Sequence, residues 1–138
     1  EGYRTIAVPI FSNDTYVRGV EFELTDAVIK ELEARTGWKV TASGSADSIL
    51  LGRIREVDKD QISRSRLSGL GQEVIVSVTI DFEWRDLRTD RAIVAREGFA
   101  GSGLYEPSNP SSEREELGRM AAVQKLARDV VSELRAVW

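Results

Sequence analysis

The segment between Val74 and Trp84 constrains the fold of this chain most strongly. Apolar side chains recur there at every second position, at Val74, Val76, Val78, Ile80, Phe82 and Trp84. The positions between and after them are polar apart from Ile75, and carry Ser77, Thr79, Asp81, Glu83 and Arg85. Such period-two alternation is typical of a strand with one buried and one hydrated face. The chain is therefore expected to fold around a sheet that is covered on one side only.

Three further strands are predicted. Residues 4–11 alternate apolar and polar side chains, and Pro9, which has no amide hydrogen, should lie at an edge or near the end of that strand. Residues 48–66 begin apolar, become charged and predict a long strand. Residues 92–103 follow a hairpin turn at 87–91 and predict the fourth strand. The glycines of its GFAGSG run at 98–103 indicate a bulge or the close approach of another backbone.

Two helices are predicted, one after the first strand and one at the end of the chain. Apolar residues at helical spacing mark residues 20–35, and Gly37 is expected to take the left-handed conformation that ends a helix. A loop with two prolines at 106–112 precedes the second helix. Its start is indicated by Ser112 and Glu115, which match a capping box.

The order of these elements is β-α-β-β-β-α, without a linker or an internal repeat. A helix between the first two strands predicts a parallel crossover, whereas the later strands should form antiparallel hairpins. The predicted fold is an α/β (α+β) two-layer sandwich, with a four-stranded mixed sheet and two helices on one face. The length of 138 residues suits a single domain over residues 1–138.

Composition excludes several classes of function. The chain has no His and no Cys, which removes thiol nucleophiles, disulfides, the usual zinc sites and histidine acid–base catalysis. We therefore expect no enzyme, and no cofactor or metal. The net charge of −4 argues against a nucleic-acid partner, which normally meets a basic surface. No stretch has the roughly 18 apolar residues that a membrane-spanning helix needs.

Asp81 and Glu83 form the most obvious pair of candidate catalytic carboxylates. They lie two apart on a predicted strand, so they point to the same face and could do acid–base work or hold a metal. The alternative is that they simply occupy the hydrated face of the sheet, with Arg85 neutralising a neighbour. The sequence favours this second interpretation.

A cationic stretch on the long strand and its loop is the more suggestive candidate. Five positive side chains fall between residues 53 and 66, namely Arg53, Arg55, Lys59, Arg64 and Arg66. At its end, cationic and apolar residues are interleaved in ISRSRL at 62–67. Because arginine forms bidentate contacts with phosphate, such a tip could bind a molecule that is both anionic and apolar. Alternatively, the charges protect an edge strand from aggregation.

Several segments together carry a family resemblance. They are IAVPIFSNDT at 6–15, GVEFELTDAV at 19–28, ADSILLGRI at 46–54 and the DLRTDR turn at 86–91. In these segments the chain resembles the LptE family of lipopolysaccharide-assembly outer-membrane lipoproteins, and GYR at 2–4 resembles the residues after that family's lipidated cysteine. The similarity extends from Tyr3 to the last helix. The family fold, a four-stranded sheet with two helices on one face, agrees with the order of elements above.

The resemblance implies a non-catalytic protein on the periplasmic face of the outer membrane. It would be held in the inner leaflet by an N-terminal lipid anchor that this sequence does not contain. Its expected partners are the β-barrel translocon LptD, which it would plug and help to assemble, and lipopolysaccharide. On this interpretation Arg64, Arg66 and Lys59 are the candidate lipopolysaccharide-binding residues, although the family's basic positions lie outside the matching segments.

A second resemblance remains open at the level of sequence. The start of the chain is also similar to other cell-envelope lipoprotein interaction modules, such as activators of penicillin-binding proteins (peptidoglycan synthases). The ADSILLG segment at 46–52, followed by a long charged strand and the alternating strand, favours the LptE family.

Overall fold

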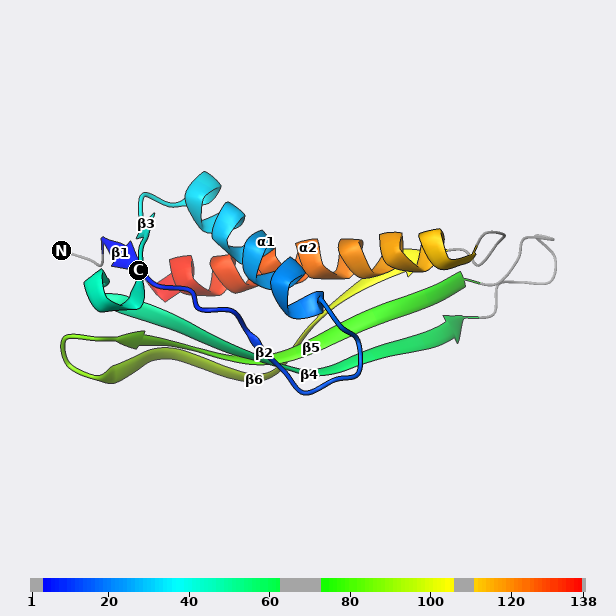
Figure 1. Ribbon diagram of the computed structural model, residues 1–138, viewed down its shortest axis with the longest axis horizontal. Coiled ribbons are helices and arrows are strands. Elements are labelled where there is room, and N and C mark those ends of the chain that lie inside the picture. Colours follow the sequence, from blue (N-terminus) through cyan, green and yellow to red (C-terminus); the bar gives the residue numbers. More distant parts are fainter. Residues whose placement is uncertain (1–3, 63–72, 106–110, 138) are drawn as a thin grey trace.

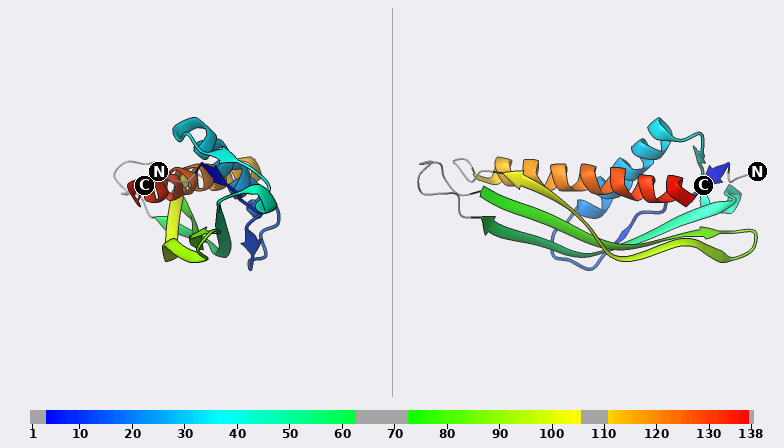
Figure 2. Two further views of the ribbon diagram at one scale, coloured as in Figure 1. Left: turned by 90° about the vertical axis from the view of Figure 1, so that its left-hand side faces the viewer. Right: turned by 180° about the vertical axis from the view of Figure 1, so that it is seen from behind.

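The computed structural model describes residues 4–62, 73–105 and 111–137, with the side chains of 61–62 and 111–114 left out. Within these ranges the molecule is elongated, and two helices lie over one face of a sheet (Figures 1 and 2). The first described residues and the end of the last helix lie at the same end of the long axis, here called the proximal end (Figure 1). The opposite, distal end contains the last residues of β4 and β6 and the first residues of β5 and α2.

The main sheet has four strands in the order β2-β4-β5-β6. Its members are β2 (Ser12–Asn13), β4 (Ser48–Ile62), β5 (Glu73–Asp86) and β6 (Arg91–Tyr105). The three long strands form antiparallel pairs, whereas β2 lies parallel to β4. Two short parallel strands, β1 (Thr5–Ile6) and β3 (Lys39–Val40), form a second sheet at the proximal end. The predicted mixed four-stranded sheet is therefore confirmed.

The prediction of one continuous first strand over 4–11 is wrong. Its first part, β1, lies between β3 and β4, because Ala7 N donates to Ser48 O at 2.9 Å and Leu50 N donates to Ala7 O at 2.8 Å. The strand ends there because Pro9 has no amide to continue the ladder. The chain pairs with β4 again only at β2. In the residues between, the Phe11 amide donates to Thr25 Oγ1 at 3.0 Å.

The first helix, α1 (Val20–Arg35), has the predicted bounds, but Gly37 does not end it by a left-handed turn. The positive φ of 92° is found at Gly19, the residue before the helix. The helix is ended by Thr36 instead. Its hydroxyl donates to Leu32 O at 2.6 Å and accepts the Trp38 amide at 3.1 Å. The side chain thus provides hydrogen-bond partners for backbone groups at the helix end that a left-handed glycine turn would otherwise pair.

The second helix, α2 (Ser111–Val137), begins one residue before the predicted capping box, whose side chains lie outside the described residues. It runs along the sheet over β5 and β6, while α1 crosses it towards the proximal end (Figure 1). Both helices therefore cover one face of the sheet, as predicted. Among the described residues, neither helix is apolar over a stretch long enough to cross a membrane.

The core lies between the helices and β5. Burial alternates along the whole of β5, and every even position from Val74 to Asp86 is buried, which confirms the predicted pattern. Trp84 is fully buried, and its ring centroid lies 5.1 Å from that of Trp38. Further along the strand, Phe82 meets Phe99 edge to face at 5.2 Å. Aromatic contacts thus fill the proximal and middle parts of the core.

Glycines on β6 allow α2 to lie directly on the sheet. A Cβ atom placed on Gly101 would lie 3.0 Å from Ala122 O, and one on Gly103 would lie 2.8 Å from the Cβ of Ala121. These positions have no room for a side chain, so helix backbone meets strand backbone there. The predicted close approach of another backbone to the glycines of this strand is confirmed.

Candidate ligand and partner surfaces

Of the three candidate lipopolysaccharide-binding residues, only Lys59 falls within the described part of the chain. Arg64 and Arg66 lie outside the described residues. Lys59 Nζ donates to Glu115 Oε2 at 2.6 Å, which joins the distal part of β4 to the first turns of α2. This hydrogen bond to the Glu115 carboxylate stabilises the ammonium ion and raises the pKa of Lys59 above its usual range.

The two other described cations of this stretch also meet carboxylates. Arg53 forms an ion pair with Asp14, in the segment before α1, and Arg55 Nη1 lies 3.3 Å from Asp81 Oδ2 on β5. All these side chains are at least partly exposed, so each pair contributes little to stability, about 0–1 kcal/mol. The positive surplus of the sequence is therefore balanced locally along the described part of β4.

A small hollow adjoins Lys59 at the distal end. It has a volume of about 200 Å³ and is lined by Lys59, Asp60, Val74 and Tyr105. Lys59 faces the helix side of the sheet, because it is the register partner of the buried Val76. The hollow thus brings a cation next to an aliphatic and an aromatic side chain, a combination suited to an amphipathic anion.

Asp81 and Glu83 do not act as a pair. Asp81 Oδ1 accepts the amide of Gly98 at 3.0 Å, while Glu83 forms an ion pair with Arg85 at 2.6 Å. Gly98 has a φ of 66° and lies where the β5–β6 register shifts, so Asp81 holds a β-bulge in place. Within the described ranges, no group of three or more acidic side chains could hold a metal ion. The arrangement favours the interpretation of a hydrated sheet face.

The face of the sheet opposite the helices, here called the outer face, is less polar than β5 alone predicts. An open groove of about 480 Å³ crosses it, and its apolar lining includes Pro9, Ile10, Leu51 and Ala95. Ile10 is 54% exposed and Leu51 is 44% exposed. Both residues fall in strands predicted from the sequence, but their exposure on this surface was not predicted. The consecutive Leu50 and Leu51 carried a signal for this apolar surface. Neighbouring residues of a strand point to opposite faces, so only one of the two leucines can face the core.

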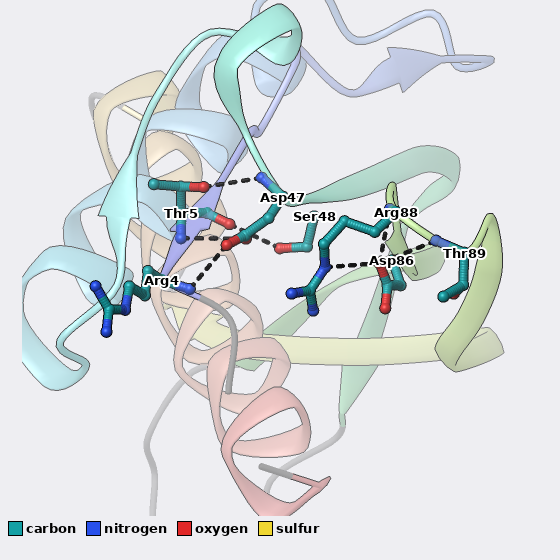
Figure 3. A network of polar contacts seen from close by, with 7 residues as sticks. All are labelled: Arg4, Thr5, Asp47, Ser48, Asp86, Arg88 and Thr89. Carbon is teal, nitrogen blue, oxygen red and sulfur yellow. Dashed lines mark hydrogen bonds and ion pairs between the residues drawn. The ribbon is translucent and has the colours of Figure 1, made fainter. Parts of the chain in front are cut away.

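A network of hydrogen bonds at the proximal end fixes the start of the described chain (Figure 3). The Asp47 carboxylate accepts the amides of Arg4 and Thr5, both at 3.2 Å, and the Asp47 amide donates to Thr5 Oγ1 at 2.8 Å. Ser48 Oγ adds a bond to Thr5 O at 2.9 Å. Residues that are more than forty positions apart in the sequence are therefore held together by one carboxylate and two hydroxyls.

Asp86 organises the neighbouring hairpin turn. Its Oδ1 accepts the amides of Arg88 at 2.8 Å and Thr89 at 3.4 Å (Figure 3). The Leu87 amide donates to Asp47 O at 3.0 Å, so this turn and the Asp47 network adjoin. Two of the segments that carry the family resemblance, 46–54 and 86–91, thus meet at the proximal end.

Asn13 organises the turn before α1, as Asp86 organises the hairpin turn. Its Oδ1 accepts the Thr15 amide at 2.9 Å, and its Nδ2 donates to Val17 O at 2.8 Å and Glu21 Oε1 at 2.9 Å. Glu21 also accepts the Gly19 amide, and its pKa is lowered by hydrogen bonds from backbone amides and from Asn13. The characteristic residues of the N-terminal segments therefore build the fold rather than a reaction centre.

The comparison with protein families decides between the two sequence resemblances. The model of the LptE family, described as lipopolysaccharide-assembly, matches residues 3–134. This is nearly the whole chain and includes β1, the Asn13 turn, the Asp47 network and both helices. The chain belongs to the LptE family. A comparison with curated protein sequences gave no match.

Solved structures show the same fold at low sequence identity. A minor lipoprotein from Acinetobacter baumannii is 16% identical, with a TM-score of 0.64 over 97% of this chain and 94% of that one. The rare lipoprotein B from Shewanella oneidensis is 15% identical, with a TM-score of 0.58 over 96% and 95%. Lipoprotein GNA1162 from Neisseria meningitidis is 12% identical, with a TM-score of 0.54 over 96% and 99%.

Family membership identifies this LptE-family protein as a lipopolysaccharide-assembly lipoprotein of the cell outer membrane. The family is not one of enzymes, which agrees with the expectation drawn from composition. The described residues agree with this assignment: the carboxylates of Asp47 and Asp86 hold the start of the described chain and a hairpin turn. The described cations of the positive stretch, Arg53, Arg55 and Lys59, each meet a carboxylate.

Proposed function

We propose that this protein plugs and helps to assemble an LptD-type outer-membrane β-barrel, and that it contacts lipopolysaccharide through its distal tip. The observation that carries the proposal is the family match over residues 3–134. A lipid anchor at the N-terminal side would hold the protein in the inner leaflet of the outer membrane.

The shape and the surface of the molecule support the role of a plug. The fold is long and narrow (Figure 2). The outer face presents polar side chains of β5, and the open groove lies beside them. Ser77 and Thr79 lie at the positions of β5 that alternate with the buried core residues. Such a partly apolar, hydrated face suits contact with the polar wall and water of a barrel interior.

The chemistry of the tip supports contact with lipopolysaccharide. The lipid A part of that molecule combines phosphates with acyl chains. The ISRSRL segment at 62–67 interleaves cationic and apolar residues, and Lys59 borders a hollow that Val74 and Tyr105 also line. Arginine and lysine would bind the phosphates, and the apolar groups would meet the acyl chains.

Binding of purified lipopolysaccharide by charge-reversal variants tests the tip. Arg64→Glu combined with Arg66→Glu is expected to weaken binding at least tenfold, and Lys59→Glu should weaken it further. Lys30→Glu is the matched control, because Lys30 is an exposed lysine on α1 whose ion-pair partner, Asp26, lies on the same helix. Unaltered binding by the double variant would overturn the role of the tip.

Affinity capture of the full-length lipidated protein from native membranes tests the partnership. We expect a large outer-membrane β-barrel of the lipopolysaccharide-transport type, identified by mass spectrometry. Recovery of a peptidoglycan synthase without such a barrel would contradict the proposal and favour the other class of envelope lipoprotein.

A further inference from the structure

The two edges of the main sheet differ in charge. β4 forms one edge beyond Ile54, because β2 pairs with β4 only at Arg53 and Ile54. Most residues of that edge between 55 and 60 are charged, namely Arg55, Glu56, Asp58, Lys59 and Asp60. Charged side chains along an edge strand discourage pairing with other chains. The β4 edge is therefore protected.

β6 forms the other edge, and its distal half is uncharged. Residues 99–105 have the sequence FAGSGLY. This stretch pairs with β5 along one edge. Within the described ranges, no backbone hydrogen bond is formed along its other edge, which points away from β5. The bulge at Gly98 separates it from the proximal half of β6, where Arg91, Arg96 and Glu97 lie. Residues 99–105, here called the open edge, thus lack the protection found on β4.

Two exposed leucines flank the open edge. Leu104 is 56% exposed and points to the outer face, because its neighbour Gly103 faces α2. On the helix side, Ala121 lies over Gly103, and Leu117, one turn earlier on α2, is 61% exposed. A strand added to the open edge would therefore find an apolar side chain beside each of its faces.

A second copy of this chain does not fit there. The contacts of Gly101 and Gly103 with helix backbone place α2 directly above β6. Two open edges paired about a two-fold axis would bring their α2 helices to about one strand spacing, roughly 4.8 Å, on the same side of the joined sheet. Packed helices need about 8–10 Å between their axes. The open edge instead has room for a single strand that carries no helix above it.

We propose that the open edge binds an extended, uncharged segment of the β-barrel partner as an additional strand of the sheet. Main-chain hydrogen bonds with alternate residues of 99–105 would supply the affinity, and apolar side chains of the segment would contact Leu104 and Leu117. The identity of the partner rests on the proposed function, whereas the edge and the chemistry of its occupant rest on the structure.

The test uses the full-length protein and the purified LptD-type barrel of the same organism. Hydrogen exchange of the complex should show at least tenfold slower exchange of amides within 99–105 than in the free protein. Ala100→Lys places a charge on the open edge at an exposed position and should weaken binding at least tenfold. Ala42→Lys is the matched control, because Ala42 is also an exposed alanine but lies at the proximal end, away from the open edge, and its change should alter binding less than threefold.

A second substitution, Leu117→Ser, tests the helix side without altering the strand, and should weaken binding by about threefold to tenfold. A complex that forms with unchanged exchange in 99–105, and that tolerates Ala100→Lys, would overturn the open-edge inference and leave the proposed function standing. Equal weakening by Ala100→Lys and Ala42→Lys would assign the loss to the added charge wherever it lies, and would also overturn the inference. Failure of the unmodified protein to bind the barrel would overturn the proposed function itself.

Discussion

The proximal and distal ends of the molecule bury their apolar surface in different ways. At the proximal end both helices cover the sheet, Trp38 and Trp84 are in contact, and Asp47 binds the start of the described chain. At the distal end α1 is absent, and α2 alone lies over β5 and β6 through backbone contacts at glycines (Figure 1). Lys59 occupies the helix-facing side that α1 leaves uncovered. The proximal end is thus the stable base of the fold, and the distal end is accessible to ligands.

The largest effect is expected from Trp84→Ala at the proximal end. Removal of this fully buried ring leaves a cavity against Trp38 and should lower the free energy of unfolding by roughly 3–5 kcal/mol. Urea denaturation measures the change. Leu104→Ala, at the distal end, is the control: its side chain is exposed, so a change within about 0.5 kcal/mol is expected. A similar loss for both variants would contradict the proposed difference between the two ends.

Gly103→Ala tests the backbone packing of the distal end. The added methyl group would collide with Gly118 O and with Ala121, and should cost about 1–3 kcal/mol because helix backbone cannot move aside as a side chain can. Gly44→Ala is the matched control, since a Cβ there meets open space. Thermal unfolding of the two variants gives the comparison. Equal melting temperatures would show that α2 is held less closely than the structure indicates.

The sequence predicted the helices and long strands well because these elements depend on local periodicity. The alternation of β5 and the helical spacing of α1 each specify one buried face, and the structure confirms both. The start of the chain was predicted less well. Its pairing depends on the absent amide of Pro9 and on a bond from the Phe11 amide to Thr25, which connects residues fourteen positions apart. Local patterns carry no information about such a partner.

The surfaces were predictable in part. The glycines of β6 signalled close packing, although the sequence could not show that α2 was the element in contact. The cationic stretch was visible as a surplus, but Lys59 and Arg55 meet Glu115 and Asp81, whose nearness is created by the fold. The open edge could not be predicted either, because an uncharged strand is exposed only if it lies last in the sheet, and strand order is a tertiary property.

Asp47→Ala should loosen the proximal base by a smaller amount. It removes the acceptor of the Arg4 and Thr5 amides, of which the second is partly buried, and should cost about 1–2 kcal/mol. Hydrogen exchange at these two amides should become faster, while exchange in the distal half of β5 should not change. Asp47→Asn keeps one acceptor oxygen and should have a milder effect. Unchanged exchange at Thr5 in Asp47→Ala would contradict the role of this carboxylate.

The smallest effect is expected at the distal ion pair. Glu115→Gln removes the carboxylate whose hydrogen bond and charge raise the pKa of Lys59 above 10.5. Both side chains are about half exposed, so the loss of stability at pH 8 should stay below roughly 0.5 kcal/mol. Because the pKa of Lys59 is raised in the folded state, the contribution of the pair is fully present below pH 10.5 and is lost as the pH rises through the folded-state pKa. Urea denaturation of both proteins between pH 8 and pH 12 should therefore show a small difference that narrows at the alkaline end.

High salt should also reduce that difference at pH 8, since it screens exposed charges. A difference in the free energy of unfolding that is independent of both pH and salt would mean that Glu115 stabilises the first turns of α2 by an interaction other than its ion pair with Lys59. In that case an anionic ligand could bind Lys59 without competing with Glu115. A stability difference that closes as described would instead identify an electrostatic pair between Lys59 and Glu115. If Lys59 binds lipopolysaccharide phosphates as proposed, these compete with the carboxylate, and Glu115→Gln should bind lipopolysaccharide more tightly than the unmodified protein.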